Sequence, residues 1–497
     1  MSTKARLRTT LDRLPFGEEG MPYELKVTNR LPAGVKSGEL YQDIIKIAWP
    51  SFIELLLTQL TSMVDMMMVG SIGGTVNPEM GARALSAVGL TTQPKFLLMT
   101  AFMAMNTGIT ALVSRSKGKN DKEKANLIVR QGLLFNLLFG IIFSVLGYLF
   151  ARPMVLFMGS TEEVVTQWAT QYLQIQMIGF ITMALTSTIT ASLRAVGDSR
   201  TCMVYNLVAN LVNVVFNWLL IFGNLGMPEM GVAGASLATV IGQIVAFIMA
   251  ATVLIRGNDF LKLEFKKGFK PDGPVLKDIV KVGVPAMVEQ LLMRAGMIIF
   301  AKTVASMGTI AYATHQVCMN IQALSFMTGQ AFAVSATSLV GQSLGKRRPD
   351  MAQAYCSKTR TVGMLFSILL ALIFIFFGGT IVGFYNGDPQ IVEMGGQIML
   401  FVAFLQPFQS SQFITAGGLR GAGDTKTIAV ITFLTVLLVR PGVAILLVNM
   451  GYGLYGAWIA MAVDQLLRTM LVLLRYYSGK WKLVKLEKAG KEEKKNA

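Results

Sequence analysis

The chain has 497 residues, of which 53% are hydrophobic and 15% are charged, and its formal net charge is +17. Soluble globular domains are nearer 25% charged, and the mean hydropathy of this chain is +0.54. This composition excludes an ordinary soluble protein and indicates a polytopic protein of the lipid bilayer. The positive charge lies in the tails and in short loops between apolar runs, which is typical of membrane topology. We therefore expect no nucleic acid partner.

The apolar segments divide the chain. Residues 1–43 mix charges of both signs with three prolines and contain no apolar core, which predicts a cytoplasmic N-terminal tail and no cleavable signal peptide. Each run that follows is long enough for a membrane-spanning helix of about 20 residues. The twelve runs cover approximately residues 44–71, 84–113, 127–151, 165–190, 201–224, 231–255, 279–306, 313–341, 360–385, 391–417, 427–450 and 453–476. A basic cytoplasmic tail at 477–497 ends the chain.

The loops between the runs alternate in charge. Those after the odd-numbered runs contain few basic residues, whereas three after even-numbered runs are strongly basic. Because basic loops stay in the cytoplasm, we expect both termini to be cytoplasmic, in a multi-pass protein of the cell's plasma or inner membrane. The basic residues are Arg115, Lys117, Lys119, Lys122 and Lys124, then Lys262, Lys266, Lys267 and Lys270, then Lys346, Arg347 and Arg348.

Four short motifs occur twice, which indicates an internal duplication. The duplication predicts an N-lobe at 44–255 and a C-lobe at 279–476, joined by a basic cytoplasmic linker at 256–278. Since six helices is an even number, both copies enter the membrane in the same orientation. We therefore predict an all-α fold of twelve transmembrane helices in two six-helix lobes, related by a pseudo-two-fold axis along the membrane normal, with a central cleft. The paired motifs begin at Leu193 and Leu419, Thr110 and Thr337, Pro50 and Pro285, and Gly231 and Gly453.

The first apolar run carries two carboxylates, Glu54 and Asp65. They are 11 residues apart, so at about 100° per residue they lie within about 20° of each other around the helix axis. Thr58, Thr61 and Ser62 complete a polar stripe on this face. Ionisable side chains at membrane depth are costly and usually line an ion or substrate pathway. The alternative is a stripe that neighbouring helices satisfy.

The repeated Leu-Arg-x-x-Gly-Asp motif predicts a structural turn in each copy. Gly197 and Gly423 permit positive φ, and Asp198 and Asp424 precede the next helix, where an acid can cap free N–H groups. Arg194 and Arg420 satisfy the positive-inside rule.

Together, several motifs resemble the multidrug and toxic compound extrusion (MATE) family, across about 44–476 of the chain. The resemblance implies twelve helices in two lobes and multidrug efflux, the export of organic, often cationic, compounds against an inward flow of Na⁺ or H⁺. The motifs are the repeated Leu-Arg-x-x-Gly-Asp turn, Ala313–Val317, Leu339–Gln342, Asn213–Asn217 and the spacing from Pro50 through Asp65 to Gly70.

The resemblance also implies a cation-coupling site in the N-lobe. Asp65 matches the family's acid, Asn213 and Asn217 match a pair on the fifth helix, and Thr239 matches a hydroxyl on the sixth. Asn213 and Asn217 share a helix face, and the set offers hard oxygen donors. Asp65 would be the metal ligand if Na⁺ is the coupling ion, but a single acid favours H⁺. Interhelical hydrogen bonding is the alternative role for the asparagines.

A substrate cleft is the expected surrounding of this stripe. Glu54 should line its inner half and meet a cationic substrate, and Met63 and Met66 offer adaptable apolar contacts. Pro50 is the expected hinge of the first helix. In the C-lobe, Glu289 is a further cleft candidate, although Arg294 could neutralise it.

Other polar residues are expected to be structural. Asp464 and Arg468 should form an ion pair one turn apart, Arg440 and Pro441 should kink the eleventh helix, and His315 should be a packing residue. Cys202, Cys318 and Cys356 are too widely spaced for a disulfide framework or a metal site.

Alternatives to a small-molecule antiporter remain open at this stage. One is a flippase for a lipid-linked or polysaccharide precursor, from the same superfamily. Another is a twelve-helix antiporter of the major facilitator type, whose usual loop motif is missing between the second and third runs. Transport driven by ATP is disfavoured because no Walker motif occurs, and a membrane enzyme is disfavoured because no H-E-x-x-H or G-x-S-x-G motif supports a hydrolase. We expect no cofactor, a small organic substrate and a monomer.

Overall fold

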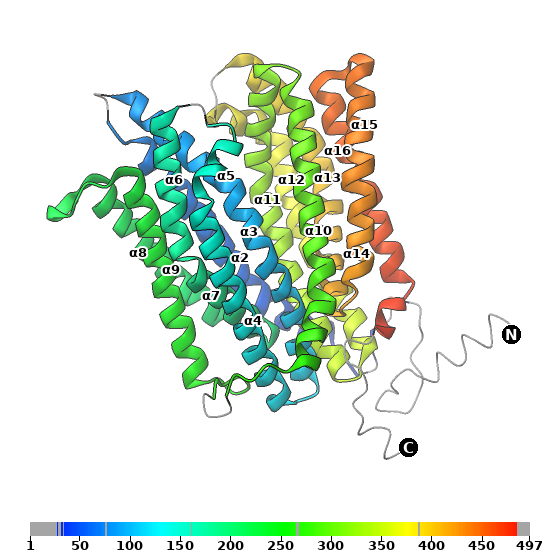
Figure 1. Cartoon of the computed structure of the whole chain (residues 1–497). Coiled ribbons are helices and arrows are strands. Elements are labelled where there is room, and N and C mark those ends of the chain that lie inside the picture. Colours follow the sequence, from blue (N-terminus) through cyan, green and yellow to red (C-terminus); the bar gives the residue numbers. More distant parts are fainter. Residues whose placement is uncertain are drawn as a thin grey trace. The chain divides into compact units, whose positions relative to one another are not determined.

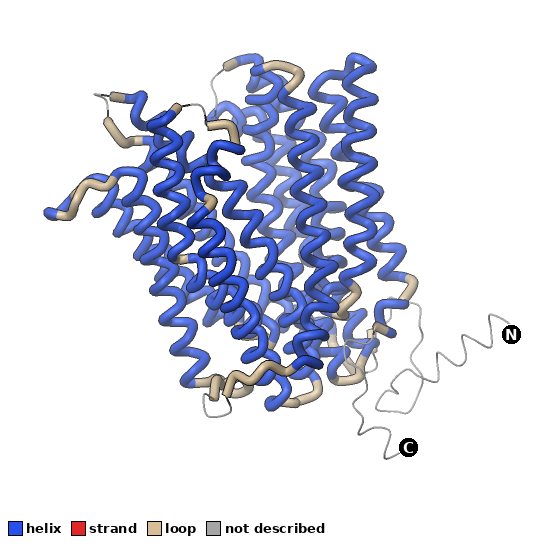
Figure 2. The backbone as a smooth tube through the Cα atoms, viewed as in Figure 1, coloured by secondary structure: helices blue, strands red, loops and turns tan. Residues whose placement is uncertain are grey.

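The structure is a computed structural model, and it describes residues 27, 31–32, 34–74, 77–160, 162–264, 268–385 and 388–484. These residues form helices and no β-strand (Figure 2), which confirms the all-α prediction. Three predicted segments lie wholly or partly outside the described residues. They are the N-terminal tail (most of 1–43), the linker residues 265–267 and the C-terminal tail from 485.

Short loops and turns connect successive helices along most of the chain (Figure 1). Every predicted apolar run coincides with one helix or with a consecutive group. The elements are α2 (Ser37–Gly70), α3 (Pro78–Gly118), α4 (Lys122–Leu149), α5 (Ala151–Phe157), α6 (Glu163–Ile178), α7 (Phe180–Ala195), α8 (Ser199–Phe222), η1 (Asn224–Gly226), α9 (Gly231–Arg256), α10 (Gly273–Ala305), α11 (Thr309–Gly345), α12 (Pro349–Tyr385), α13 (Pro389–Gly421), α14 (Thr425–Thr432), η3 (Phe433–Val439), α15 (Arg440–Leu447), η4 (Val448–Tyr452), α16 (Gly453–Tyr477) and η5 (Lys480–Leu483).

The described helices provide twelve membrane crossings. Ten are long and apolar enough to be candidate spans, and α6 with α7, bent by 49° at their junction, makes an eleventh. The last of the ten, Thr425–Tyr477, has 53 residues, more than twice the about 20 that a crossing needs. Gly451 and Gly453 have φ of 92° and 51° inside it, and α15 packs back against α16. This segment is therefore two crossings, as predicted.

The chain divides into two compact units. The Asp65 unit comprises Ile53–Ile109 and Lys122–Val280. The Trp458 unit comprises Thr110–Asp121, Lys281–Ala497 and Met1–Phe52, each within its described residues. Helices α2, α3 and α10 each contribute a segment to both units. The lobe boundaries inferred from the repeat, 44–255 and 279–476, stay a prediction.

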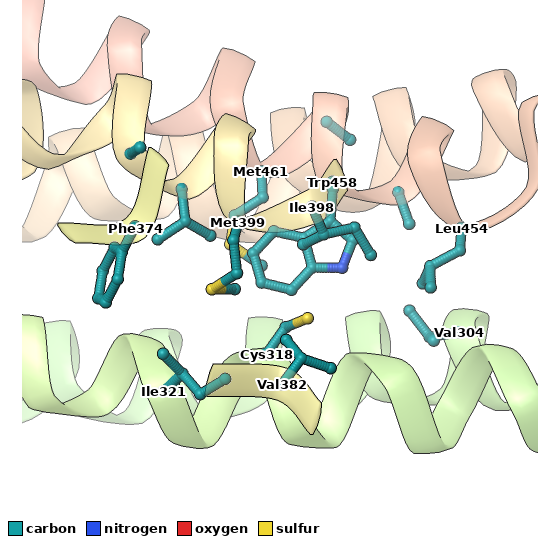
Figure 3. Close-up of a cluster of buried hydrophobic side chains, with 14 of the residues drawn as sticks. Val304, Cys318, Ile321, Phe374, Val382, Ile398, Met399, Leu454, Trp458 and Met461 are labelled. Carbon is teal, nitrogen blue, oxygen red and sulfur yellow. The ribbon is translucent and has the colours of Figure 1, made fainter. Parts of the chain in front are cut away.

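The core of the Trp458 unit is packed around its fully buried tryptophan. Trp458 on α16 lies among side chains of α10 to α13, including Val304, Cys318, Val382 and Met399 (Figure 3). Lipid tails are as apolar as the side chains, so the hydrophobic effect does not drive helices together within a bilayer. Close van der Waals packing of this kind holds them together instead. Outward-facing apolar residues surround the core; Phe376 of α12, for example, is 73% exposed. This distribution is that of a protein embedded in lipid.

The repeated turn has the geometry that its glycines permit. Gly197 and Gly423 have φ of 94° and 86°, as predicted. Asp198 caps α8, because its Oδ1 accepts from the Thr201 N–H at 3.3 Å. The same prediction is wrong for Asp424, which makes no backbone cap. Its carboxylate accepts instead from Arg475 Nε at 2.6 Å, so an ion pair to α16 replaces the cap.

Small residues let α9 pack closely against α8. Gly234, Ala238 and Gly242 recur every four residues along one face of α9, a spacing that brings membrane helices close together. A Cβ atom at Gly242 would lie 2.9 Å from the Ala209 carbonyl oxygen on α8. This close approach brings Thr239 of α9 beside the polar face of α8.

Candidate cation site

The polar stripe of α2 faces a row of asparagines on α8. Asn206 Nδ2 donates to Glu54 Oε1 at 2.6 Å, and Asn210 Nδ2 donates to Thr58 Oγ1 at 3.4 Å. Asn217 Nδ2 donates to Asp65 Oδ1. The two residues of each pair are 152 positions apart, so α2 and α8 run parallel in constant register.

The asparagines of α8 lie on one face because of their spacing. Asn206, Asn210, Asn213 and Asn217 are separated by four, three and four residues, the spacing of one helix face. Sequence reasoning identified Asn213 and Asn217 but missed Asn206 and Asn210. The complete row was visible in the sequence as a periodic pattern, and it matches the 11-residue separation of Glu54 and Asp65.

The structure brings Asp65, Asn213, Asn217 and Thr239 together, and these four residues are called the Asp65 site below. Asp65 is contributed by α2, the asparagines by α8 and Thr239 by α9. Asn217 is fully buried, and its Oδ1 has no hydrogen-bond donor within the described part of the chain. An amide oxygen beside a carboxylate, both in a low-dielectric setting, is a ready ligand for a cation.

Asn213 joins Asp65 to Thr239 in the Asp65 site. Its amide nitrogen donates to Asp65 Oδ1 at 2.8 Å, and its amide oxygen accepts from the Thr239 N–H at 3.2 Å. Because Asn217 Nδ2 also donates to Asp65 Oδ1, the carboxylate receives hydrogen bonds from both asparagines of α8.

A second layer of polar residues, which sequence reasoning missed, surrounds the Asp65 site. The Ser236 hydroxyl on α9 donates to the Tyr172 carbonyl oxygen on α6 at 2.7 Å. Lys95 Nζ on α3 donates to Gln176 Oε1 at 2.7 Å. Gln176 Nε2 donates in turn to the Ser236 carbonyl oxygen at 3.2 Å, one turn before Thr239. Five helices of the Asp65 unit therefore contribute to one polar cluster.

Glu54 belongs to an ion pair that has an equivalent in the other unit. Arg194 Nη2 lies 2.7 Å from Glu54 Oε1, and Arg420 is paired with Glu289. Both acids follow the repeated proline, and both arginines belong to the repeated turn. Sequence reasoning attributed the arginines to membrane topology alone and considered Arg294 as the partner of Glu289. A substrate-contacting role for Glu54 and Glu289 stays a prediction.

The other candidates on α2 differ in exposure. Met66 is 38% exposed and Met63 is half-buried; they lie about 100° and about 160° around the axis of α2 from Asp65, so neither shares its helix face. Pro50 is buried inside the continuous helix Ser37–Gly70. Its hinge role and the methionine contacts to substrate stay predictions.

The residues predicted to be structural have packing and ion-pair roles. Arg468 Nη2 lies 3.0 Å from Asp464 Oδ2, which confirms that pair, and Arg440 binds the same oxygen. The helix before Arg440 is π-helical over Phe433–Val439, which is how the chain accommodates Pro441. His315 is buried between the rings of Phe300 and Trp458, with centroids 5.5 and 5.6 Å away, which confirms its packing role. The three cysteines are buried and free, as predicted.

Comparison with known proteins agrees with this architecture. The family model MatE matches residues 50–219 and 285–446. The chain is 28% identical over 445 residues to a probable multidrug resistance protein NorM of Thermotoga maritima, covering 89% of this chain and 93% of the relative. It is 27% identical over 440 residues to multidrug resistance protein MdtK of Yersinia pestis, covering 87% and 94%.

Solved structures share the fold. An outward-facing multidrug resistance MATE family transporter of the MOP superfamily has a TM-score of 0.81 at 20% identity, and the match covers 92% of this chain and all of the other. Structures of this kind have twelve helices in two lobes. Members of the family are transporters and not enzymes. With the family model matching most of both halves, the chain belongs to the MATE family of multi-pass membrane transporters.

Proposed function

We propose that this protein is a secondary active exporter that couples inward movement of H⁺ or Na⁺ at the Asp65 site to outward movement of an organic, cationic compound. The observation that carries the proposal is the buried Asn217 Oδ1 beside the Asp65 carboxylate, without a hydrogen-bond donor in the described structure. Asn213 and Thr239 add two further oxygen atoms. One carboxylate with neutral oxygen ligands suits a proton or a hard monovalent cation.

Coupling requires that the ion favour one conformation over the other, since equal affinity for both shifts no equilibrium. The amides of α8 support such a difference. The amide nitrogens of Asn213 and Asn217 donate to Asp65 and stabilise its empty, charged carboxylate, so a bound cation must compete with these hydrogen bonds. A single carboxylate binds either H⁺ or Na⁺, and the two would compete. Because the site holds one acid, we favour H⁺.

The substrate class is supported by the names of the relatives and by the chemistry of α2. Both curated relatives are named as multidrug resistance proteins, which does not favour the flippase alternative. Asp65 offers a negative charge, and the next residue of α2, Met66, is an apolar side chain that is 38% exposed. A cationic compound with apolar parts would find both features there. We place the protein in the plasma membrane as a monomer, with its basic loops in the cytoplasm.

The test is dye efflux from proteoliposomes that contain the full-length protein, with Na⁺ and pH gradients imposed separately. Asp65→Asn should leave expression and folding near normal and abolish gradient-driven export. Leu60→Ala is the matched control and should export like the unmodified protein, because Leu60 is an exposed apolar residue of the same helix that lies about 140° around the axis from Asp65. If Asp65→Asn still concentrates dye against a gradient, the coupling ion binds elsewhere, and Glu289 becomes the next candidate.

A further inference from the structure

We propose that Lys95 is a tethered counter-ion of Asp65, a fixed positive charge that weakens the binding of the coupling cation at that carboxylate. This inference rests on the proposed function, since it takes Asp65 as the place where the coupling cation binds. It adds a residue that sets the affinity of the Asp65 site without being one of its ligands.

Lys95 is held inside the Asp65 unit by a specific contact. A lysine in a membrane-spanning helix usually extends its ammonium to the interface. Here Lys95 Nζ donates to Gln176 Oε1 at 2.7 Å, and Gln176 is only 1% exposed. The Gln176 amide is itself fixed, because its nitrogen donates to the Ser236 carbonyl oxygen at 3.2 Å. The ammonium is therefore positioned by α6 and α9, the two helices that also carry Tyr172 and Thr239.

The backbone next to Lys95 is also unusual. Pro94 lies inside α3, and proline has no N–H to donate to the carbonyl four residues earlier. The interrupted hydrogen bonding of α3 at this point permits a bend of the helix. Lys95 follows immediately and presents its side chain to α6, as its hydrogen bond to Gln176 requires.

The ammonium acts on Asp65 through charge and not through a shared hydrogen bond. Gln176 links the Lys95 ammonium to the Ser236 carbonyl oxygen, one turn before Thr239, and Asn213 links Thr239 to Asp65. The ammonium therefore lies in the same polar cluster as the carboxylate, while its own hydrogen bond goes to Gln176. The Asp65 carboxylate thereby keeps its oxygens for Asn217, Asn213 and an incoming cation. Of the elements packed around the site, α2, α3 and α6 supply the titratable groups Asp65, Lys95 and Tyr172, whereas α8 and α9 supply neutral amides and a hydroxyl.

The charge count explains what such a lysine does. Asp65 and a charged Lys95 together have a net charge of zero when the Asp65 site is empty. Their net charge becomes positive when a monovalent cation binds. The incoming cation is therefore opposed by a like charge. As a general scale, at an effective dielectric constant of about 20 a like charge about 10 Å away weakens the binding of a monovalent cation on the order of tenfold. An exporter gains from this, because the ion must also leave, and a neutral empty site is less costly to enclose in the membrane.

Two substitutions separate the charge of Lys95 from its hydrogen bond. Lys95→Gln removes the charge and retains an N–H donor for Gln176, whereas Lys95→Arg retains the charge. The measurement is the thermal stabilisation of the purified full-length protein by Na⁺, at constant ionic strength with choline as the replacement cation. Lys95→Gln should lower the half-saturating Na⁺ concentration about tenfold relative to the unmodified protein, and Lys95→Arg should leave it unchanged. The Na⁺ response should disappear when Asp65→Asn is added to Lys95→Gln.

The outcomes distinguish this inference from the proposed function. A half-saturating Na⁺ concentration that is unchanged in Lys95→Gln overturns the counter-ion role, and the proposed function then stands or falls on the efflux test of Asp65→Asn. If Na⁺ does not stabilise the unmodified protein, the coupling ion is H⁺, and the half-maximal proton concentration for dye efflux is measured instead. It should fall about tenfold in Lys95→Gln, and an unchanged value overturns the counter-ion role. A Na⁺ response that persists in Asp65→Asn with Lys95→Gln contradicts the coupling site itself. If Lys95→Gln fails to fold, Lys95→Met combined with Gln176→Leu removes both partners of the buried hydrogen bond, which is often nearly neutral for stability. The same tenfold change is expected there.

Discussion

The Glu54 carboxylate on α2 lies 2.7 Å from the Arg194 guanidinium on α7, with the acid side chain 8% and the arginine side chain 20% exposed. Glu289 and Arg420 form the same pair from the same motif positions in the other unit. A duplicated motif has therefore kept a duplicated ion pair. Within each unit, the pair connects the helix that contains the repeated proline to the repeated Leu-Arg-x-x-Gly-Asp turn.

Removing one member of this pair should destabilise the Asp65 unit. Glu54→Gln leaves Arg194 buried without its counter-charge, which costs about 3–5 kcal/mol for a fully buried pair and less here because Arg194 is partly exposed. The melting temperature in detergent should fall, and Glu54→Gln combined with Arg194→Gln should recover part of the loss.

Dye export separates this structural role of Glu54 from a role in substrate binding. If Glu54 also meets the substrate, Glu54→Gln should weaken export of cationic dyes more than export of neutral dyes. Equal loss for both classes, together with recovery in the double variant, would leave the ion pair as its sole role.

Asn217 should matter more than its neighbour in the same row. Asn217→Ala removes the N–H donor to Asp65, and a hydrogen bond to a charged group contributes about 1.5–3 kcal/mol. Because this bond favours the charged, empty carboxylate, its loss should raise the apparent affinity for H⁺ by about tenfold to a hundredfold, measured as the pH dependence of dye efflux. Asn210→Ala removes only a contact to the Thr58 hydroxyl at 3.4 Å; it is the control and should change the affinity little. Similar changes in both variants would point to general helix packing.

Gly242 should be intolerant of even a methyl group. A Cβ atom there would lie 2.9 Å from the Ala209 carbonyl oxygen and 3.2 Å from Asn213 Cβ, so Gly242→Ala must push α9 away from α8. Such overpacking typically costs about 1–3 kcal/mol, and it should also weaken coupling because Thr239 moves with α9.

A glycine in open space provides the comparison for Gly242. Gly89 on α3 has no atom within 4 Å of a built Cβ, so Gly89→Ala should preserve or raise the melting temperature. If the two alanine variants melt alike, the close contact between α8 and α9 is not limiting.

Labelling with a membrane-impermeant thiol reagent tests the orientation of the chain. In a background without the three native cysteines, Lys262→Cys in the basic linker should resist labelling in intact cells, because basic loops remain in the cytoplasm. Leu225→Cys, 85% exposed in the loop between α8 and α9, should be labelled readily. The reverse result would invert the predicted topology.

Composition and periodicity predicted most of this fold because transmembrane helices must satisfy their own backbone hydrogen bonds. The membrane therefore converts a run of apolar residues into a helix with little dependence on tertiary context. The bend between α6 and α7 and the π-helical turns before Arg440 were not predicted in detail. They depend on local hydrogen-bond geometry, which hydropathy does not encode.

The candidate site was only partly accessible from the sequence. Asp65, Asn213 and Asn217 follow helical spacing and a family pattern, so they were identified. Lys95 was missed because its role depends on which face of α3 meets α6, and a single lysine beside Pro94 has no periodic partner. The pairing of Glu54 with Arg194 was missed for another reason. The positive-inside rule accounts for Arg194 without any partner, so nothing in the sequence indicates that Arg194 pairs with Glu54.

The constant offset of 152 residues between α2 and α8 has a consequence for how this segment tolerates insertions and deletions. Loops accept added or lost residues, but deleting one residue between Glu54 and Asp65 would rotate one end of the stripe by about 100° relative to the other. Only one of the two acids could then face the asparagines, and the other would be left without its amide partner. The residues between Glu54 and Asp65 can therefore be substituted more readily than they can be deleted or added to, because their number sets the angle between the two acids.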